Sequence, residues 1–446
     1  MDKRNAEKII KEAVELKRDR IKAIAHTIYK HPETGYREFE TAALAARYLG
    51  ELGLEVMCLP DIPGVVAVWD TGKEGPVIAI LGELDAVINT SHPDAHPVTG
   101  AVHACGHHAQ IAAMLGSAMV LCQPQIKGLI CGKIVFMAVP AEEFIEVEYR
   151  NELRQKGIIR YFGGKAEFLH RGLFDEVALC MMIHISPHHT HKVYFPQGTN
   201  GFLTKNIKYI GKAAHAGASP EQGINALYAA NIGLMAANCL RETFEEKDCI
   251  RFHPIITKGG DVVNVIPQEV HIEAQLRGKD IKKVVEINKK IDRAFIGGAL
   301  AMGAEIEIED LPGYMPLRPD KQLSDVCKKV LKGLMSEEEY TDEAHGTYSL
   351  DMGDLSTLMP TLHPFIQGAE GGMHSTEYKI VNEETAYILS TQILALTALE
   401  LLWKDGKAAQ KIVSNYSPLF HTKHEYFSFV DKLFDRKVFT ITDILK

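Results

Sequence analysis

Four stretches of the sequence carry side chains that could bind a metal ion. They hold Cys105 and His107, Glu142 and Glu143, His184, and His374. Thiolate, imidazole and carboxylate are the usual ligands of Zn²⁺, Mn²⁺, Co²⁺ and Ni²⁺. A cysteine near a histidine is by itself more often part of a packed interior. The prediction of a metal site therefore depends on the recurrence of ligand types at four separate places.

The adjacent carboxylates of Glu142 and Glu143 could do two different jobs. Neighbouring side chains diverge, so one carboxylate could bind a metal ion while the other faces the water bound to that ion. A metal ion lowers the pKa of such a water to about 7, and a nearby carboxylate can accept the proton and pass it to a leaving group. The alternative is that the pair simply marks an acidic helix N-terminus.

Short apolar runs precede most of these residues and are predicted to be buried strands. The runs are 64–70, 75–85, 133–143 and 177–186. Helical periodicity is found over 6–30 and 38–53, and again from Cys105 onward. Strands that end in chemically active residues, with helices between them, indicate an α/β fold whose mostly parallel sheet carries the site at its carboxyl edge.

The pattern changes between residues 196 and 310, where the predicted elements follow the order βαββαβ. This order is typical of a small ferredoxin-like α+β sandwich. We therefore predict an inserted domain at 196–311, between two parts of a catalytic domain at 1–195 and 312–446. In the tail after residue 404, the segment EYFSFVDKLFDRKVF is predicted to be an amphipathic helix.

Composition excludes some classes of partner. The chain has 446 residues and a net charge of −9, which argues against nucleic-acid binding. We see no apolar run of the roughly 18–20 residues that a membrane span needs, and the charged N-terminus has no export-signal pattern. The eight cysteines are irregularly spaced, as expected of reduced thiols. The prediction is a cytoplasmic protein.

Eight motifs occur in the order found in one family of enzymes. They are HPETGYREFET, GELDAV, HACGHHAQIAAMLG, VPAEE, IHIS, AAHAGASPEQGINAL, VVNVIPQEV and GMHSTE. The sequence resembles the metal-dependent amidohydrolases that include hippurate hydrolase, the auxin-conjugate hydrolases, aminobenzoyl-glutamate hydrolase and the aminoacylase/carboxypeptidase relatives. The resemblance covers about residues 20–403. It implies a zinc-exopeptidase-like sheet with helices on both faces and an inserted domain that acts as a lid and mediates dimers.

The resemblance assigns roles to matching positions. The ligands of a two-metal site would be Cys105, His107, Glu143, His184 and His374. The ions would be Zn²⁺ or Mn²⁺, with Co²⁺ or Ni²⁺ as alternatives. Glu142 would act as general base and acid, and Asp85 would orient a ligand.

The inserted domain would also contribute to the reaction. By the same resemblance His215 would polarise the scissile carbonyl, in its own site or in that of a partner subunit. Asn264 would hold the oxyanion or a substrate carboxylate, and Arg277 would bind a carboxylate. These roles imply a homodimer formed through the inserted domain. The alternative for an isolated histidine in such a loop is a structural cap.

Three features depart from the family pattern. His108 stands where many relatives have aspartate, and it would either face a neighbouring loop or alter the choice of metal. Residues 144–165 form a longer, charged segment beside the predicted site, so they would reshape or gate the substrate pocket. The histidines after IHIS are expected to be exposed loop residues; they are His188, His189 and His191.

The leading hypothesis is a metal-dependent amidohydrolase that cleaves a small N-acyl or N-aroyl amino acid, of aminobenzoyl-glutamate type or related. A dipeptidase or an N-acetyl-amino-acid deacetylase is the alternative among enzymes. An alternative of another class is a catalytically silent, metal-binding scaffold or regulatory subunit.

Overall fold

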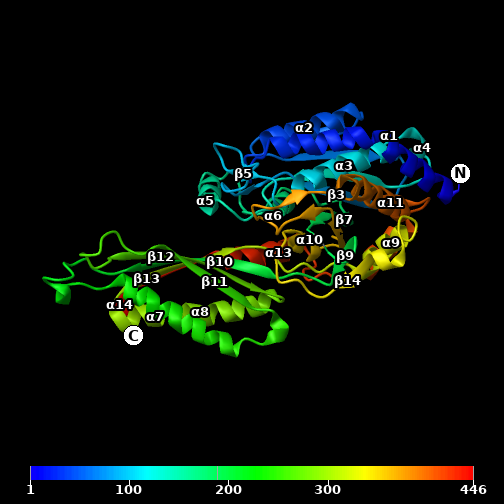
Figure 1. The fold of residues 1–446 in the computed structure, drawn as a ribbon. Coiled ribbons are helices and arrows are strands. Elements are labelled where there is room, and N and C mark those ends of the chain that lie inside the picture. Colours follow the sequence, from blue (N-terminus) through cyan, green and yellow to red (C-terminus); the bar gives the residue numbers. More distant parts are fainter. Residues whose placement is uncertain (1, 188, 445–446) are drawn as a thin grey trace. The chain divides into compact units, whose positions relative to one another are not determined.

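The computed structural model describes residues 2–187 and 189–444, which form two compact units (Figure 1). The first unit consists of Met1–Gln197, Arg318–Ala344 and Asp354–Leu419. The second unit consists of Gly198–Leu317, His345–Gly353 and Phe420–Lys446. His188 lies outside the described residues.

A six-stranded sheet forms the centre of the first unit, in the order β1-β2-β6-β3-β7-β15. Its strands are β1 (Glu55–Cys58), β2 (Val65–Asp70), β6 (Lys133–Val139), β3 (Val77–Glu83), β7 (Leu179–Met181) and β15 (Thr361–Leu362). The strands from β6 to β15 are parallel, whereas β1 and β2 pair antiparallel at one edge. The predicted α/β class with a mixed, mostly parallel sheet is confirmed.

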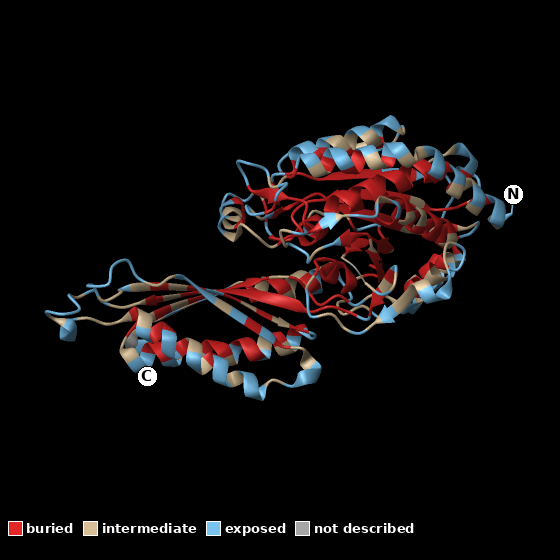
Figure 2. Ribbon diagram, in the orientation of Figure 1, coloured by how far each residue is buried: buried red, intermediate tan, exposed pale blue. Residues whose placement is uncertain are grey.

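Helices enclose this core, as Figure 2 shows by burial. The long ones are α1 (Lys3–Lys30), α2 (Phe39–Glu51), α3 (His107–Leu121), α9 (Lys321–Leu331) and α11 (Ser390–Leu402), the last preceded by a π-helical turn at Glu384–Leu389. Every residue of α3 is buried, because its sequence is apolar on all sides and it packs against helices as well as against the sheet. The shorter helices are α4 (Pro124–Lys127), α5 (Val147–Gln155), α6 (Gly164–His170), α10 (Met352–Ser356) and α12 (Lys407–Asn415).

One apolar segment is longer than the sequence analysis expected. Within the described residues, Glu384–Leu402 is long and apolar enough to cross a membrane by length and composition. Since 83% of that apolar window is buried inside the protein, the segment has the properties of a core helix.

A second small sheet interrupts the strand expected at 177–186. The first part of this segment is strand β7 of the large sheet. The next part, β8 (His184–Ser186), belongs to a second sheet of order β14-β9-β16-β8. Its other strands are β14 (Tyr340–Glu343), β9 (Val193–Pro196) and β16 (Phe365–Gln367). Two hairpins complete the unit: β4 (Val87–Ile88) with β5 (Ala101–Val102), and β17 (Ala369–Glu370) with β18 (Lys379–Ile380). The change of sheet places His184 at the start of a strand and not at the end of one.

The second unit has the ferredoxin-like order of elements. Its elements are β10 (Gly201–Ile210), α7 (Ala226–Cys239), β11 (Arg251–Lys258), β12 (Glu269–Gly278), α8 (Ile281–Met302) and β13 (Glu305–Pro312). The strands form one antiparallel sheet, and both helices lie along the same face of it (Figure 1). The alternating burial of β12 and β13 fits a sheet with one covered face.

The C-terminal tail differs from the expectation. The segment expected to be one helix is helical only over α13 (Lys423–Val430), and then forms β19 (Asp435–Phe439). β19 pairs antiparallel with β13, so residues from 420 onward belong to the second unit and not to the first. Lys437 explains the attachment, because its ammonium lies 2.8 Å from a carboxylate oxygen of the buried Asp292. The last helix is α14 (Ile441–Ile444).

Candidate metal centre

Loops and element ends in the first unit bring the predicted metal ligands together. Glu142 and Glu143 follow β6, and His184 opens β8. Cys105 lies just before α3, of which His107 is the first residue. All five side chains are buried, which is unusual for ionisable groups unless they are paired or bind a cation.

His374 reaches the same place from the loop between β17 and β18. Its backbone is in the left-handed region, with φ of 63°, which is uncommon for any residue other than glycine. Two hydrogen bonds hold it there: its N–H donates to the carbonyl of Ala104, and its carbonyl accepts from Nδ2 of Asn89, both at 2.9 Å. The side chain is 51% exposed, so this ligand faces the accessible side of the centre.

The ligand atoms form two groups that share one thiol. Cys105, His107 and His184 form the first, Cys105, Glu143 and His374 the second, and the donor atoms of each lie within 4.8 Å of one another. Cys105 Sγ is 3.5 Å from His184 Nε2, and His374 Nε2 is 3.0 Å from Glu143 Oε1. Ligand atoms about 2.0–2.3 Å from one ion are about 2.8–3.8 Å apart, depending on whether the geometry is octahedral or tetrahedral. Each group could therefore hold one divalent ion, and Cys105 belongs to both groups.

Asp85 connects both groups from behind. The Nδ1–H of His107 donates to the backbone carbonyl of Asp85 at 2.9 Å and to its Oδ1 at 3.1 Å. The other oxygen, Oδ2, accepts from the backbone N–H of Glu143 at 2.8 Å. Burial would lower the pKa of His107, but the carboxylate of Glu83 outweighs it and raises this pKa well above its usual value. With Nδ1–H held by Asp85, a metal ion that displaced the other proton would meet the lone pair of Nε2. The carboxylate of Asp85 thus orients two ligands at once.

The electrostatics of the metal-free cluster favour a cation. Burial lowers the pKa of His184 to about 4, which leaves its imidazole neutral and able to accept a metal. Burial would raise the pKa of Glu143, but the hydrogen bond from His374 outweighs it and lowers the pKa to about 2. Burial raises the pKa of the Cys105 thiol well above its usual value. A bound divalent ion would reverse this last effect, since a coordinating thiol loses its proton.

His108 turns away from the centre. It belongs to none of the three groups of potential ligands found among the described residues. Its Nε2 lies 3.3 Å from the hydroxyl of Tyr387, and burial lowers its pKa to about 3. Of the two alternatives predicted for His108, the structure supports contact with a neighbouring segment.

The charged insertion supplies a brace for the Glu142–Glu143 loop. Arg150, on α5, is completely buried, and its guanidinium donates to the carbonyls of Ala141, Glu143 and Phe162. From the other side, Glu38 Oε1 accepts from the N–H of Ala141 at 2.8 Å. Ala141 has a φ of 58°, a conformation that a surrounding structure must impose. The sequence predicted a charged segment here but not its buried arginine.

Room for this guanidinium depends on the absence of one side chain. A Cβ at Gly35 would lie 2.4 Å from Nη2 of Arg150. Gly35 belongs to the HPETG motif, so part of that motif's local structure is fixed by the insertion's arginine.

A buried ion pair behind His107 was also missed. Lys165 Nζ lies 2.6 Å from Oε1 of Glu83, and both side chains are almost fully buried. The motif GELD carries two carboxylates, and the sequence analysis gave a role only to the second, Asp85. The position of Glu83, two residues before Asp85, could have pointed to it. Nothing in the sequence around Lys165, GGKAEFL, indicates that this lysine pairs with Glu83.

The second unit brings His215 and Asn264 together on adjacent exposed loops. His215 bridges to Val265, and the N–H of Ala216 donates to the carbonyl of Asn264 at 3.0 Å. His215 Nδ1 accepts from two backbone N–H groups, at 3.0 and 3.2 Å. The proton of the neutral imidazole therefore lies on Nε2, which is free to act as a donor.

Arg277 lies at the opposite end of β12 from Asn264. At about 3.3 Å per residue, this strand separates the two residues by roughly 30 Å. Arg277 packs on the ring of Phe202, 5.5 Å from the ring centre, and donates to Oε1 of Gln275 at 2.7 Å. Within one second unit, the structure does not bring it to His215 and Asn264.

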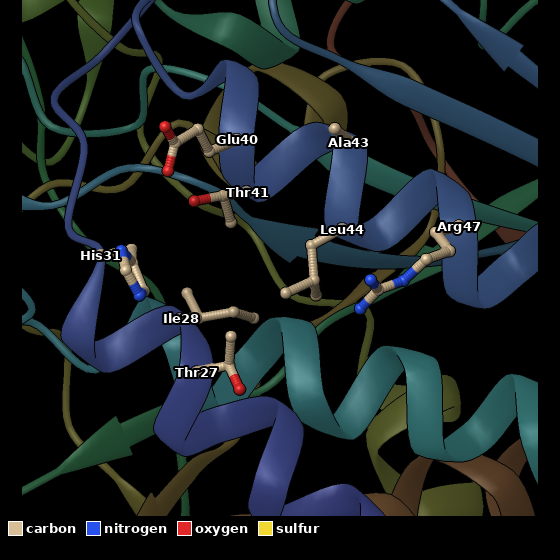
Figure 3. Close-up of a pocket in the computed structure, with 8 residues that line it drawn as sticks. All are labelled: Thr27, Ile28, His31, Glu40, Thr41, Ala43, Leu44 and Arg47. Carbon is tan, nitrogen blue, oxygen red and sulfur yellow. The ribbon is translucent and has the colours of Figure 1, made fainter.

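A separate surface pocket of about 490 Å³ lies between α1 and α2 (Figure 3). Thr27, Ile28 and Leu44 line it, together with His31, Glu40 and Arg47 at its polar margin. None of the residues that line it belongs to a potential metal group among the described residues. The pocket is therefore distinct in composition from the metal centre.

Residues 79–400 match peptidase family M20/M25/M40. The chain belongs to this family. The match spans both units and includes the ten residues predicted for the site. M20 relatives are hydrolases of amide and peptide bonds, so this protein is a hydrolase of that class, and the predicted family resemblance is confirmed.

Curated relatives of this M20 protein have diverse substrates. The chain is 29% identical to a Xaa-Arg dipeptidase of Mus musculus over 90% of this chain and 89% of the relative. It is 27% identical to an N-acetylcysteine deacetylase of Bacillus subtilis, over 65% and 73%. It is 26% identical to a p-aminobenzoyl-glutamate hydrolase chain of Escherichia coli, over 75% and 67%.

Solved structures show the same fold. A Staphylococcus aureus protein described as an aminohydrolase superposes with a TM-score of 0.72 at 25% identity, covering 89% of this chain and 99% of that one. A dinuclear metal-binding peptidase of family M20 from Bacillus subtilis superposes with a TM-score of 0.66 at 22% identity, over 86% and 98%. The family and the ligand groups together support a divalent metal cofactor.

Proposed function

We propose that this M20 protein uses two divalent ions to hydrolyse the amide bond of a small N-acyl or N-aroyl amino acid. The observation that carries the proposal is the pair of ligand groups sharing Cys105, with a second carboxylate, that of Glu142, beside them. Zn²⁺ or Mn²⁺ are the proposed ions, with Co²⁺ or Ni²⁺ as alternatives. When bound, they would polarise the amide carbonyl and lower the pKa of water.

Glu142 is the proposed general base and acid. It is buried, and its Oε2 lies 3.9 Å from His107 Nε2, so its carboxylate stands at the rim of the ligand cluster without being one of the five proposed ligands. It would accept a proton from the attacking water and then deliver that proton to the departing amine nitrogen. A carboxylate in this role contributes about 10²–10⁴-fold to the rate.

His215 and Asn264 are the proposed oxyanion donors. The Nε2–H of His215 is available, and the adjacent side chain of Asn264 can donate through its amide. Such donors act when they are aimed at the oxygen that becomes negative in the transition state. Arg277 remains a proposed carboxylate-binding residue, in a separate part of the second unit.

We further propose a homodimer formed through the second unit. Helix α7 exposes Tyr228, Ile232 and Met235 at 58%, 38% and 67%, and their spacing places them on one helical face. Strand β11 is a sheet edge and exposes Ile255 and Ile256. A hydrophobic helical face and an open strand edge favour self-association.

A charged side chain introduced on the exposed apolar face of α7 tests the proposed dimer. Met235→Glu should shift the molar mass measured by light scattering from dimer to monomer, whereas Lys282→Glu on the exposed surface of α8 should not. A wild-type protein that is monomeric at micromolar concentration would contradict this part of the proposal.

Dipeptide hydrolysis is the second candidate. The mouse Xaa-Arg dipeptidase matches nine tenths of this chain, so a dipeptide with a basic C-terminal residue belongs in any substrate panel. The deacetylase and aminobenzoyl-glutamate relatives support the N-acyl substrates of the leading proposal.

We propose a cytoplasmic location, in keeping with eight cysteines that are all free of disulfides.

A metal-reconstituted hydrolysis assay tests the function. The protein is stripped with a chelator, reloaded with each of the four ions, and incubated with N-acyl amino acids, aroyl-glutamates and dipeptides. Mass spectrometry then follows release of free amine. Paired substrates such as N-acetyl-arginine and alanyl-arginine separate deacylase from dipeptidase activity. Cleavage that requires metal supports the proposal; bound metal without cleavage of any substrate supports the silent scaffold.

A further inference from the structure

Glu83 places an additional carboxylate oxygen beside His107, and the proposed ligand set does not use it. Glu83 is the last residue of β3, and its side chain is 1% exposed. Oε1 is engaged by Lys165, whereas Oε2 lies 3.2 Å from His107 Nε2. The two carboxylate oxygens therefore have different surroundings, one with a cation and one facing the nitrogen that would bind metal.

Glu83 Oε2 and His107 Nε2 lie at ion-pair distance, but their geometry is not that of a hydrogen bond. Among the described residues, neither Glu83 Oε2 nor His107 Nε2 has a hydrogen-bond partner, although both are buried. A separation of 3.2 Å is also within the range for two atoms that each lie about 2.1 Å from one ion.

The surroundings hold Glu83 in this position. Lys165 is completely buried on α6, and a buried ammonium requires a paired charge. The start of α6 packs tightly against the segment after β6, since a Cβ at Gly164 would lie 1.7 Å from the carbonyl oxygen of Pro140. Lys165 is thus fixed by the backbone, and it fixes one oxygen of Glu83 in turn.

We propose that Glu83 is a sixth ligand of the metal centre, binding through Oε2 to the ion held by His107. The donor atoms of Glu83 and His107 belong to a group of atoms within 4.8 Å of one another, whose third member, Glu142, keeps its proposed role as base. This inference rests on the two-metal centre proposed above, and it concerns binding rather than turnover.

Metal binding by matched variants tests the assignment. Glu83→Gln keeps the shape of the side chain but weakens it as a ligand, and Lys165→Met removes the ammonium that holds the other oxygen of Glu83. If Glu83→Gln alone fails to fold because it leaves the buried Lys165 ammonium unpaired, the double variant Glu83→Gln/Lys165→Met removes both charges and replaces it in the test. Asp292→Asn breaks a buried carboxylate–lysine pair in the second unit and serves as a control for ion-pair loss alone.

The readouts are the number of ions per chain and their affinities, measured with a competing chelator, and the visible spectrum of the Co²⁺ form. We expect Glu83→Gln and the double variant to weaken one of two ions by at least about tenfold and to change the Co²⁺ spectrum. Asp292→Asn should retain two ions and an unchanged spectrum, and Lys165→Met should retain two ions because Glu83 keeps its carboxylate. Wild-type affinities and spectrum in both Glu83 variants would overturn the assignment. A wild-type chain that binds no ion would overturn the two-metal centre itself.

Discussion

The proposed catalytic groups of the two units are held in opposite ways. Around the metal centre, nearly every ligand is buried and fixed by a further group: Asp85 on His107 and Glu143, Asn89 on His374. His215 and Asn264 of the second unit lie on exposed loops: the His215 ring accepts from N–H groups of its own loop, and the Asn264 carbonyl accepts from Ala216. A metal site must be preorganised before substrate arrives, whereas groups that stabilise an oxyanion can be completed when substrate binds.

Substitution of Cys105, the thiol shared by both ligand groups, should have the largest effect on metal content and turnover. Cys105→Ser should reduce the metal content from two ions toward none and the turnover to that of the metal-free protein, because this residue belongs to both ligand groups. His374→Ala removes a ligand from one group only and should leave one ion bound. Elemental analysis of the purified variants measures both outcomes, and equal metal loss in the two variants would contradict the bridging position of Cys105.

Substitutions in the second unit should separate turnover from metal binding. His215→Ala should lower kcat by about 10²–10³-fold, as expected for loss of one oxyanion donor, with both ions retained. Because the residue is exposed, the free energy of unfolding should change by less than about 0.5 kcal/mol. Val263→Ala, at a completely exposed position in the neighbouring loop, is the control. A loss of metal in His215→Ala would show that the two regions are not independent.

The brace on the Glu142–Glu143 loop should affect stability and turnover together. Arg150→Met removes a guanidinium donor from three backbone carbonyls, and a hydrogen bond to a charged group contributes about 1.5–3 kcal/mol. The carbonyls of Ala141 and Glu143 each keep a backbone donor. We expect roughly 3 kcal/mol of destabilisation and about a tenfold lower kcat. Arg150→Lys should recover part of both, and Lys156→Met at the exposed end of α5 should change neither. Denaturant unfolding and steady-state kinetics check this; unchanged values in Arg150→Met would contradict the role of the insertion.

The smallest expected effect concerns the attachment of the tail. Lys437→Met removes an ammonium hydrogen-bonded to Asp292, at a cost of roughly 1–2 kcal/mol for a bond between charged groups. Unfolding of the second unit should shift accordingly, while metal content stays the same. Lys432→Met, before β19, is the matched control. If metal content fell in Lys437→Met, the tail would have an influence beyond the second unit.

The sequence predicted those parts of the molecule in which chemistry and local pattern agree. Apolar runs that end in ligands identified the strands, and the βαββαβ order identified the inserted unit. It did not predict β19, because a five-residue strand rich in charge, DRKVF, has no period-two apolar pattern and forms only where β13 offers an edge. It also joined β7 and β8, since the change of sheet leaves no mark in the composition.

The proposed metal ligands could be predicted from the sequence, whereas the residues that hold the ligand loops in place could not. Cys105 and His107 stand in a recognisable motif. Arg150 looks like a surface residue on a charged helix, and its burial depends on contacts with Gly35, which is distant along the chain, and with Phe162. The function of a buried charge is set by tertiary packing, which the spacing of residues along the chain does not contain.

The central claim is that the buried cluster is a catalytic centre in which Glu142 moves the proton, and one variant tests it most directly. Glu142→Gln is compared with wild type and with Glu148→Gln, a substitution at an exposed carboxylate on α5, for metal content and for amine release from whichever substrate the panel identifies. We predict two ions in all three proteins and a loss of about 10²–10⁴-fold in kcat for Glu142→Gln alone. Undiminished turnover in Glu142→Gln, with both ions bound, would contradict the account.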